Sequence, residues 1–232
     1  MYALKKAAPR LMPTVCLLCS AQIPEGGILC HDCYLDLPVN QSACTFCGAP
    51  VFDNRSCGAC IRRPPWLDHT ITPYHYSYPV DSLIRKFKYS QKLMAVTPLM
   101  SLLLERIKTK AGPQPDALLP VPLHRTRLYL RGYNQSQEIC RVINRHLGIP
   151  IDGKSVFRLR PTTEQTRLTA AQRRKNVRGA FGIRPGLIYD SVAIVDDVVT
   201  TAATANEMAK VLKQAGVKRV ELWALARAGM GN

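Results

Sequence analysis

Blocks of apolar and polar residues follow each other along the last two thirds of the chain, with the periods of helices and strands. Within 81–92, Leu83, Ile84 and Phe87 recur at helical spacing with basic residues between them. Short apolar runs bounded by turn-forming or charged residues indicate buried strands. The pattern predicts helices at 81–92, 96–108, 135–147 and 200–215, and strands at 116–121, 191–196 and 217–226. Because strands and helices alternate, we predict an α/β domain with a parallel sheet and helices on both faces.

Eight of the nine cysteines lie in the first 60 residues and form four Cys-x-x-Cys pairs. The pairs are Cys16/Cys19, Cys30/Cys33, Cys44/Cys47 and Cys57/Cys60. Two residues between thiolates let one tight turn direct both sulfurs at a metal, and two such turns complete a four-thiolate zinc site. The segment therefore predicts two structural zinc ions. Disulfides are the alternative, but they would require an oxidising compartment. A redox-active cysteine pair is a second alternative, but four repeats are too many for one active site.

The pairing of these turns is less constrained by sequence. Ten residues separate the first two turns and nine separate the last two. This near-duplication favours two sequential zinc ribbons, while an interleaved pairing or a histidine ligand (His31 or His69) stays possible. So short a segment has little core, and bound metal would supply much of its folding free energy. Four thiolates also leave no open coordination position for catalysis.

Charge divides the chain unevenly. With 47% hydrophobic and 21% charged residues the composition is that of a globular protein. Residues 1–65 carry six basic and four acidic residues, and residues 66–232 carry 26 and 12, for net charges of +2 and +14. The Arg-Arg-Pro-Pro segment at 62–65 marks the expected junction between a zinc-ribbon domain, 1–65, and the α/β domain, 66–232. No apolar run approaches the roughly 18 residues of a membrane helix, and no secretory signal is recognisable. We expect a cytoplasmic protein without membrane insertion.

The strongest chemical signal is the segment 192–204, VAIVDDVVTTAAT. A buried strand leads to Asp196 and Asp197, and small and hydroxyl residues then open a helix. Ligands of open α/β sheets bind at the carboxyl ends of strands, and a helix start offers free N–H groups to a phosphate. The two acids can accept hydrogen bonds from a ribose diol or hold a hydrated Mg²⁺. The predicted phosphate-binding residues are Thr200, Thr201, Ala202, Ala203 and Thr204. The simpler interpretation is a helix N-cap that follows two acidic residues.

This segment resembles the phosphoribosyl pyrophosphate (PRPP) motif of type I phosphoribosyltransferases. Further features are the four Cys pairs, Pro120-Val121-Pro122 leading to Arg131-Gly132-Tyr133-Asn134-Gln135, and Gln165-Thr166 leading through Leu168 and Arg173 to Asn176 and Gly179-Ala180-Phe181. Taken in this order over nearly the whole chain, they resemble the ComF family of DNA-uptake and DNA-utilisation proteins. The resemblance is greatest to its GntX (YhgH) members.

The resemblance implies a double zinc ribbon and a phosphoribosyltransferase-like domain. The family is linked to handling single-stranded DNA in competent bacteria, or to growth on external DNA as a nutrient. By position, Asp196 and Asp197 would contact the ribose hydroxyls and 200–204 the 5′-phosphate. The loop after the first strand would hold pyrophosphate with Arg131 as charge partner, and 163–176 would form a flap. The family also suggests an uptake helicase or a recombination mediator as partner.

One departure from the family pattern bears on catalysis. The family usually has Gly where this chain has Ala202. Gly there permits a positive φ and leaves room beside the phosphate. We therefore expect PRPP binding, with Mg²⁺ as an accompanying ion, and leave turnover open.

A basic stretch at 158–178 carries seven basic residues and one acidic residue. They are Arg158, Arg160, Arg167, Arg173, Arg174, Lys175 and Arg178. PRPP needs fewer cations than this, so the stretch favours a longer polyanion, and we expect single-stranded DNA. Tyrosines that could stack on bases are Tyr74, Tyr76, Tyr78, Tyr89, Tyr129 and Tyr133. The alternatives are a solvated basic surface and tyrosines that pack in strands and core.

Three functions are compatible with these observations. The first is a ComF-type protein that binds single-stranded DNA and carries a PRPP-type site. The second is an active phosphoribosyltransferase of unknown acceptor, and the third is a zinc-ribbon nucleic-acid adaptor without catalysis. The net charge of +14 on 66–232 favours the first over the second. The pair Asp196–Asp197 favours the first over the third.

Overall fold

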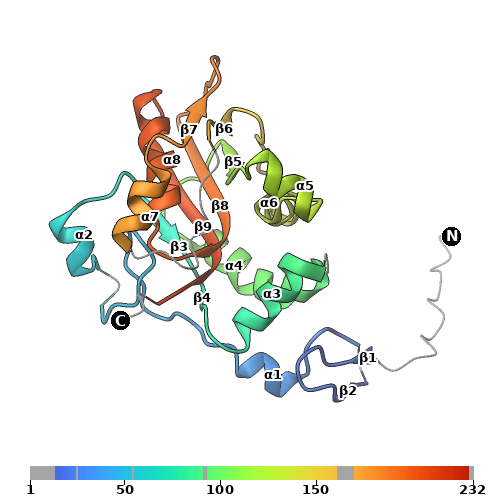
Figure 1. The fold of residues 1–232 in the computed structure, drawn as a ribbon. Helices are drawn as coiled ribbons and strands as arrows, with labels where there is room; N and C mark the ends of the chain where they lie inside the picture. Colours follow the sequence, from blue (N-terminus) through green and yellow to red (C-terminus); the bar gives the residue numbers. More distant parts are fainter. Residues whose placement is uncertain (1–13, 25, 54, 91–92, 161–169, 230–232) are drawn as a thin grey trace, which may run out of the picture.

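A parallel sheet forms the centre of the molecule (Figure 1). The computed structural model describes residues 14–24, 26–53, 55–90, 93–160 and 170–229. The strands of this sheet are β3 (His69–Ile71), β4 (Tyr74–His75), β5 (Ala117–Pro120), β8 (Ser191–Val199) and β9 (Arg219–Arg227). Their order is β3-β9-β8-β5, β4 also pairs with β9, and these pairings are all parallel. The carboxyl ends of the strands therefore meet at one edge.

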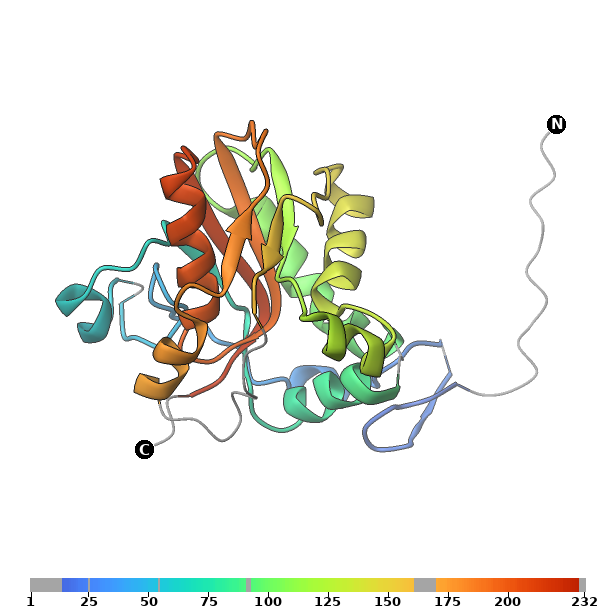
Figure 2. The ribbon, with the colours of Figure 1, turned by 45° about the horizontal axis from the view of Figure 1, so that its top comes forward.

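Helices cover both faces of the sheet, as predicted (Figure 2). One face packs against α3 (Val80–Ser90), α4 (Thr97–Thr109) and α6 (Gln135–Leu147), with the 3-10 turn η1 (Leu93–Val96) before α4, and the other packs against α8 (Ala203–Gln214). Successive residues of β8 serve opposite faces: Ala193 and Val195 the first, Val192 and Ile194 the second. A strand buried on both faces is apolar at every position, which explains the uninterrupted run in the sequence.

The end of β8 differs from the prediction. The strand was expected to stop at residue 196 and the following helix to start at 200. Instead, β8 continues through Val199, because Val198 and Val199 pair with Ala226 and Arg227 of β9. Helix α8 begins only at Ala203, after a left-handed residue at Ala202. The two aspartates thus lie inside the strand, and a short loop separates them from the helix.

A two-stranded arm projects beside α8. Its strands are β6 (Val156–Arg158) and β7 (Phe181–Ile183), which pair antiparallel. Helix α7 (Ala170–Val177) lies between them in the sequence and contacts α8. The short helix α5 (Arg125–Arg131) follows β5 in the sequence and lies beside α6 (Figures 1 and 2). None of the helices in the described ranges has the length and apolarity needed to cross a bilayer.

The two N-terminal ribbons lie on opposite sides of the sheet (Figures 1 and 2). The first contains β1 (Thr14–Val15), β2 (Gln22–Ile23) and α1 (His31–Leu35), and the second contains α2 (Gly58–Arg62). Lys86 of α3 donates to the carbonyl of Leu17 in the first ribbon, at 2.8 Å. The second ribbon shares an apolar core with α8 and the sheet. The predicted domains 1–65 and 66–232 are therefore in extensive contact.

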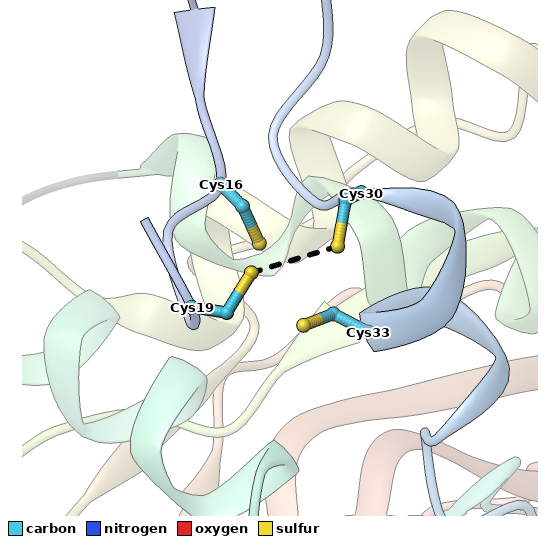
Figure 3. A group of neighbouring side chains, drawn as sticks. All are labelled: Cys16, Cys19, Cys30 and Cys33. Carbon is cyan, nitrogen blue, oxygen red and sulfur yellow. Dashed lines mark hydrogen bonds between the residues drawn. The ribbon is translucent and has the colours of Figure 1, made fainter. Parts of the chain in front are cut away.

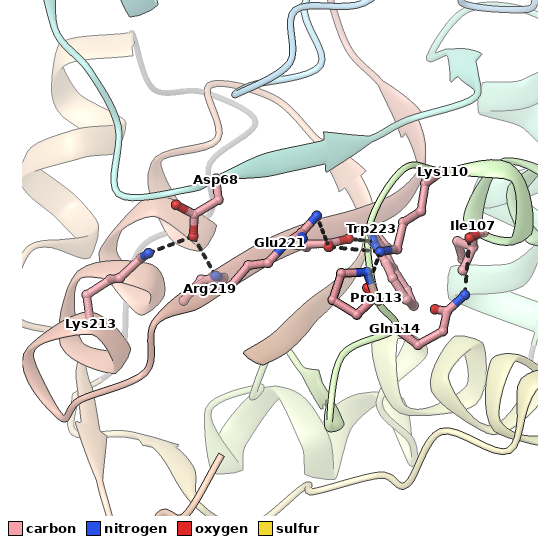
Figure 4. A network of polar contacts seen from close by, with 10 residues as sticks. Asp68, Ile107, Lys110, Pro113, Gln114, Lys213, Arg219, Glu221 and Trp223 are labelled. Carbon is pink, nitrogen blue, oxygen red and sulfur yellow. Dashed lines mark hydrogen bonds and ion pairs between the residues drawn. The ribbon is translucent and has the colours of Figure 1, made fainter. Parts of the chain in front are cut away.

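A buried ionic network occupies the amino end of β9 (Figure 4). Glu221 is fully buried and accepts from Lys110 at 3.1 Å, from Arg219 at 3.0 Å and from the indole of Trp223 at 2.8 Å. Lys110 is itself only 3% exposed and also donates to the carbonyl of Pro113. These contacts join α4 to the sheet at the edge opposite the carboxyl ends of the strands.

Candidate functional site

The first metal centre gathers four thiols from two turns (Figure 3). Sulfurs of Cys16, Cys19, Cys30 and Cys33 lie within 4.8 Å of one another. Burial would raise the pKa of Cys16, but hydrogen bonds from three backbone N–H groups outweigh it and lower this pKa to about 6. A thiol prepared to ionise in this way is suited to a metal.

The second centre is built in the same way. Cys44, Cys47, Cys57 and Cys60 form a second group within 4.8 Å, and the backbone N–H of Cys57 donates to the sulfur of Cys44 at 3.3 Å. The pKa of Cys44 is lowered to about 7, because backbone hydrogen bonds outweigh its burial. Two separate sets of four thiols fit two structural zinc ions. Sequential pairing, the favoured prediction, is confirmed.

The two aspartates of β8 point to different partners. Asp197 pairs with Lys88 of α3 at 3.0 Å, with side chains 12% and 20% exposed. The carboxylate of Asp196 accepts from the hydroxyl of Ser136, at 3.2 Å, and from the backbone N–H of Asp197, at 2.9 Å. Sequence reasoning placed Lys88 on a helix but gave it no partner, because nothing local links it to β8.

Burial and neighbouring charges shift the pKa values of Asp196 and Lys88. Burial and the neighbouring charge of Asp197 raise the pKa of Asp196 to about 7. Burial alone would lower the pKa of Lys88, but the Asp197 carboxylate outweighs it and raises this pKa. The arrangement therefore places the Asp197–Lys88 salt bridge beside an aspartate whose pKa lies near neutral pH.

The loop that follows β8 encloses a small pocket at the carboxyl edge of the sheet. Its lining residues are Asp196, Val198, Val199, Thr200, Ala202, Ala203, Thr204 and Ala205. Thr201 is not among them, and its hydroxyl accepts from the N–H of Ala203, the first residue of α8, at 3.4 Å. The structure thus brings Asp196 together with four of the five predicted phosphate-binding residues.

Ala202 adopts a backbone conformation that ordinarily favours glycine. Its φ is 55° and its ψ is 9°, in the left-handed region, and its side chain is buried. For a residue with a side chain this conformation costs about 1–2 kcal/mol. The sequence comparison with the family pattern therefore identified a real conformational requirement, which this chain meets with alanine.

Arg131 lies at the end of α5, close to the start of α6. Its guanidinium donates to the side-chain oxygen of Gln135, at 3.2 Å. Asn134 caps α6 by accepting from the N–H of Ser136, and its amide donates to the carbonyl of Val121 just after β5. Because Ser136 also donates to Asp196, the turn at 132–134 brings Arg131 and the aspartates to the same edge of the sheet.

Six of the seven predicted DNA-binding residues lie in or next to the arm and α7. Arg158 donates to the carbonyl of Pro122 and lies over the ring of Phe181, and Arg160 donates to the carbonyls of Asn176 and Arg178. Arg158 therefore connects the two strands of the arm and the loop after β5, and Arg160 connects the arm to the end of α7. Lys175 and Arg178 are exposed. Arg173 and Arg174 belong to α7, while Arg167 and most of the predicted flap before α7 lie outside the described residues.

The proposed stacking tyrosines divide into two groups. Tyr74 is buried, which excludes it, and Tyr133 packs against Phe87 and donates to its carbonyl. Tyr78 and Tyr129 are exposed. Tyr76 is partly buried, and the side chain of Tyr89 is outside the described part. Sequence reasoning missed the exposed aromatic rings of Phe52 and Trp66 on and beside the second ribbon, which no pattern marked.

Comparison with known proteins agrees with this architecture. Residues 7–61 match the double zinc ribbon domain family. Competence protein F of Haemophilus influenzae is 33% identical over 223 residues, which cover 92% of this chain and 96% of that protein. The chain belongs to the ComF family. DNA utilization protein YhgH of Escherichia coli strain K12 is also 33% identical over 223 residues, covering 93% and 98% of the two chains.

A more distant ComF-family relative is competence protein ComFC of Streptococcus pneumoniae, 25% identical over 88% of this chain and 89% of that protein. Among solved structures, adenine phosphoribosyl transferase from Trypanosoma brucei, in complex with AMP, pyrophosphate and ribose-5-phosphate, covers 58% of this chain and 53% of its own. Its TM-score is 0.37 at 15% identity. The predicted ComF-family membership and the predicted architecture, a parallel α/β sheet preceded by a double zinc ribbon, are confirmed.

Proposed function

We propose that this ComF-family protein serves the use of incoming DNA, binding single-stranded DNA and holding a phosphorylated ribose such as PRPP at the carboxyl edge of its sheet. The observation that carries the proposal is the pocket formed by Asp196 and the loop that opens α8. Two relatives at 33% identity are named for competence and for DNA utilisation.

The chemistry of the pocket supports a sugar phosphate. N–H groups at the start of α8 offer hydrogen bonds and a positive dipole end to a phosphate, and Thr200 and Thr204 add hydroxyl groups. Asp196 and Asp197 supply acceptors for the ribose hydroxyls, and their carboxylates could also bind a hydrated Mg²⁺. Arg131 supplies positive charge for the pyrophosphate. A diol reaching Asp197 would share that carboxylate with Lys88.

Titration calorimetry with PRPP and Mg²⁺ tests this site. Replacing both aspartates (Asp196→Asn with Asp197→Asn) should weaken binding by more than about tenfold, because each substitution removes the negative charge and replaces one carboxylate oxygen with an NH2 group that cannot accept from the diol. Asp190→Asn is the matched control, since Asp190 is an exposed acid at the opposite edge of the sheet. Unchanged binding in the double variant would reject the assignment.

Charge supports the DNA-binding half of the proposal. The chain carries 32 basic residues against 16 acidic ones, and Lys175 and Arg178 are exposed at α7. Binding of a fluorescent oligothymidine should weaken steeply with salt, and replacing Lys175 and Arg178 by Gln should lower the salt slope by about 1.4. Lys218→Gln, an exposed lysine at the opposite edge, is the control. A flat salt titration would contradict DNA binding.

One observation favours the alternative of a nucleic-acid adaptor without chemistry. Lys88 already occupies Asp197, one of the two acceptors that the ribose diol would use. An adaptor would bind the oligonucleotide in these assays but neither PRPP nor ribose 5-phosphate. Transfer to an acceptor, the remaining alternative, would instead show as pyrophosphate release from PRPP.

A further inference from the structure

The buried side chain of Arg227 connects the second zinc ribbon to the loop that follows β8. Arg227 is the last residue of β9 and is 2% exposed. Its Nε donates to the carbonyl of Cys47 at 2.9 Å. Its terminal nitrogen donates to the carbonyl of Val199 at 3.4 Å and also to that of Ala228. One guanidinium thus bridges a zinc-binding turn and the residue that immediately precedes Thr200.

The electrostatic surroundings of Arg227 point to the same metal centre. A buried cation is costly unless an anion lies nearby. Among the described residues, no carboxylate forms a salt bridge with Arg227, whereas the sulfurs of Cys47, Cys57 and Cys44 act on its charge. Four thiolates around one Zn²⁺ carry a net negative charge. The second centre therefore supplies the counter-charge for this arginine.

Apolar packing also connects the second zinc centre to the loop that follows β8. Cys44, Cys47 and Cys60 share one apolar core with Val199 and Ala202 of the loop. The N–H of Ala228 also donates to the carbonyl of Val199, at 2.8 Å, which fixes the start of the loop a second time. Close-packed interiors transmit displacements of this kind rather than absorbing them.

The first zinc centre has a different position. Its ribbon contacts α3 through Leu17 and Lys86, and α4 through a hydrogen bond between Tyr34 and Ser101, at 3.1 Å. Leu17, Leu18 and Leu29 pack against the core on that face of the sheet. The chain thus contains two metal centres of the same chemistry, of which the second is the one that adjoins the phosphate loop.

We propose that the second zinc centre is a positioning element of the sugar-phosphate site, and that Arg227 is the positioning residue through which it holds the loop at 200–204. The proposal rests on the proposed function, since it concerns the same pocket. Metal binding fixes the turn at Cys44–Cys47, and the carbonyl of Cys47 then orients the guanidinium, which holds Val199. Without metal the turn loosens, and the N–H groups that face a phosphate lose their fixed geometry.

Two matched ligand variants separate the centres. Cys57→Ser and Cys30→Ser each remove a half-buried ligand that opens the second turn of its ribbon. We expect both proteins to retain one zinc by metal analysis. Ribose 5-phosphate, titrated by calorimetry, should bind at least tenfold more weakly to Cys57→Ser than to the wild-type protein, and the loss in Cys30→Ser should be several-fold smaller. Equal affinities in the two variants would overturn the proposal.

Arg227→Lys decides the matter if Cys57→Ser does not fold. A single ammonium cannot reach both the Cys47 and Val199 carbonyls in the way that a guanidinium does. We expect this variant to retain both zinc ions and to bind ribose 5-phosphate at least fivefold more weakly. Wild-type affinity in Arg227→Lys would refute the role given to Arg227.

Cobalt provides a readout that a merely structural role would not move. In the Co²⁺-substituted protein, ribose 5-phosphate should change the thiolate-to-cobalt absorption of the second centre, and Cys30→Ser should retain this change. An unchanged spectrum with ligand bound would count against the coupling. If the wild-type protein does not bind ribose 5-phosphate at all, the proposed function fails, which is distinct from failure of the coupling.

Discussion

Replacing Asp196 with Asn should stabilise the protein at neutral and alkaline pH. Asp196 has a pKa raised to about 7 by burial and by the charge of Asp197. Below its unfolded pKa the group is protonated in both states and costs nothing. As the pH rises towards 7 the unfolded state releases this proton first, so folding has to take it up and stability falls. Asn cannot titrate and is spared this loss.

The size of the effect follows from the two pKa values. Moving from the ordinary value of 3.8 to about 7 corresponds to a penalty of roughly 4 kcal/mol once both states are ionised, at about 1.4 kcal/mol per unit. Between pH 5.5 and pH 8 the gain of Asp196→Asn over the wild type should grow by about 2 kcal/mol. Asn retains an oxygen for the Ser136 hydroxyl, so this hydrogen bond is not lost.

Urea denaturation of the zinc-loaded protein at several pH values measures this difference. Asp197→Asn is the contrasting variant, because it leaves Lys88 partly buried without its partner. It should lower the free energy of unfolding by about 3 kcal/mol, the opposite sign for the adjacent residue. If the stability difference between Asp196→Asn and the wild type does not change with pH, Asp196 does not titrate as described.

Three further predictions follow from other parts of the structure. Metal analysis should return two zinc ions per chain, and mass spectrometry should find the eight clustered thiols free of disulfides. Ala202→Gly should raise the free energy of unfolding by about 0.5–1 kcal/mol and tighten ribose 5-phosphate binding. Glycine removes the left-handed strain, and its greater flexibility in the unfolded state offsets only part of that gain. Equal stability of the variant and the wild type would contradict the strain. Glu221→Gln should lower the free energy of unfolding by about 3–5 kcal/mol in urea denaturation, because it leaves Lys110 without its counter-charge. The affinity for ribose 5-phosphate should not change, because Glu221 lies at the opposite edge of the sheet from the pocket.

Local spacing was sufficient to predict the zinc centres and three strands of the sheet, β5, β8 and β9, but it did not predict the short strands β3 and β4. Two residues between cysteines fix the geometry of a metal-binding turn, whatever surrounds it. The apolar run at 192–195 and the helical period at 135–147 likewise reflect burial that each element must satisfy in any fold of this class. The Asp-Asp segment could be placed at the carboxyl edge of the sheet for the same reason.

Only the tertiary structure decided what those residues contact. Pairing with β9 extended β8 past its aspartates to Val199, which a local pattern cannot show because the partner strand lies elsewhere in the chain. Lys88 meets Asp197, and Arg227 meets Cys47, 180 positions away along the sequence. Neither contact follows from composition or period, since each depends on how helices and ribbon pack on the sheet. The sequence by itself therefore determined the metal-binding turns and the strand and helix on either side of the loop at 200–204, and long-range packing determined the charges that surround this loop.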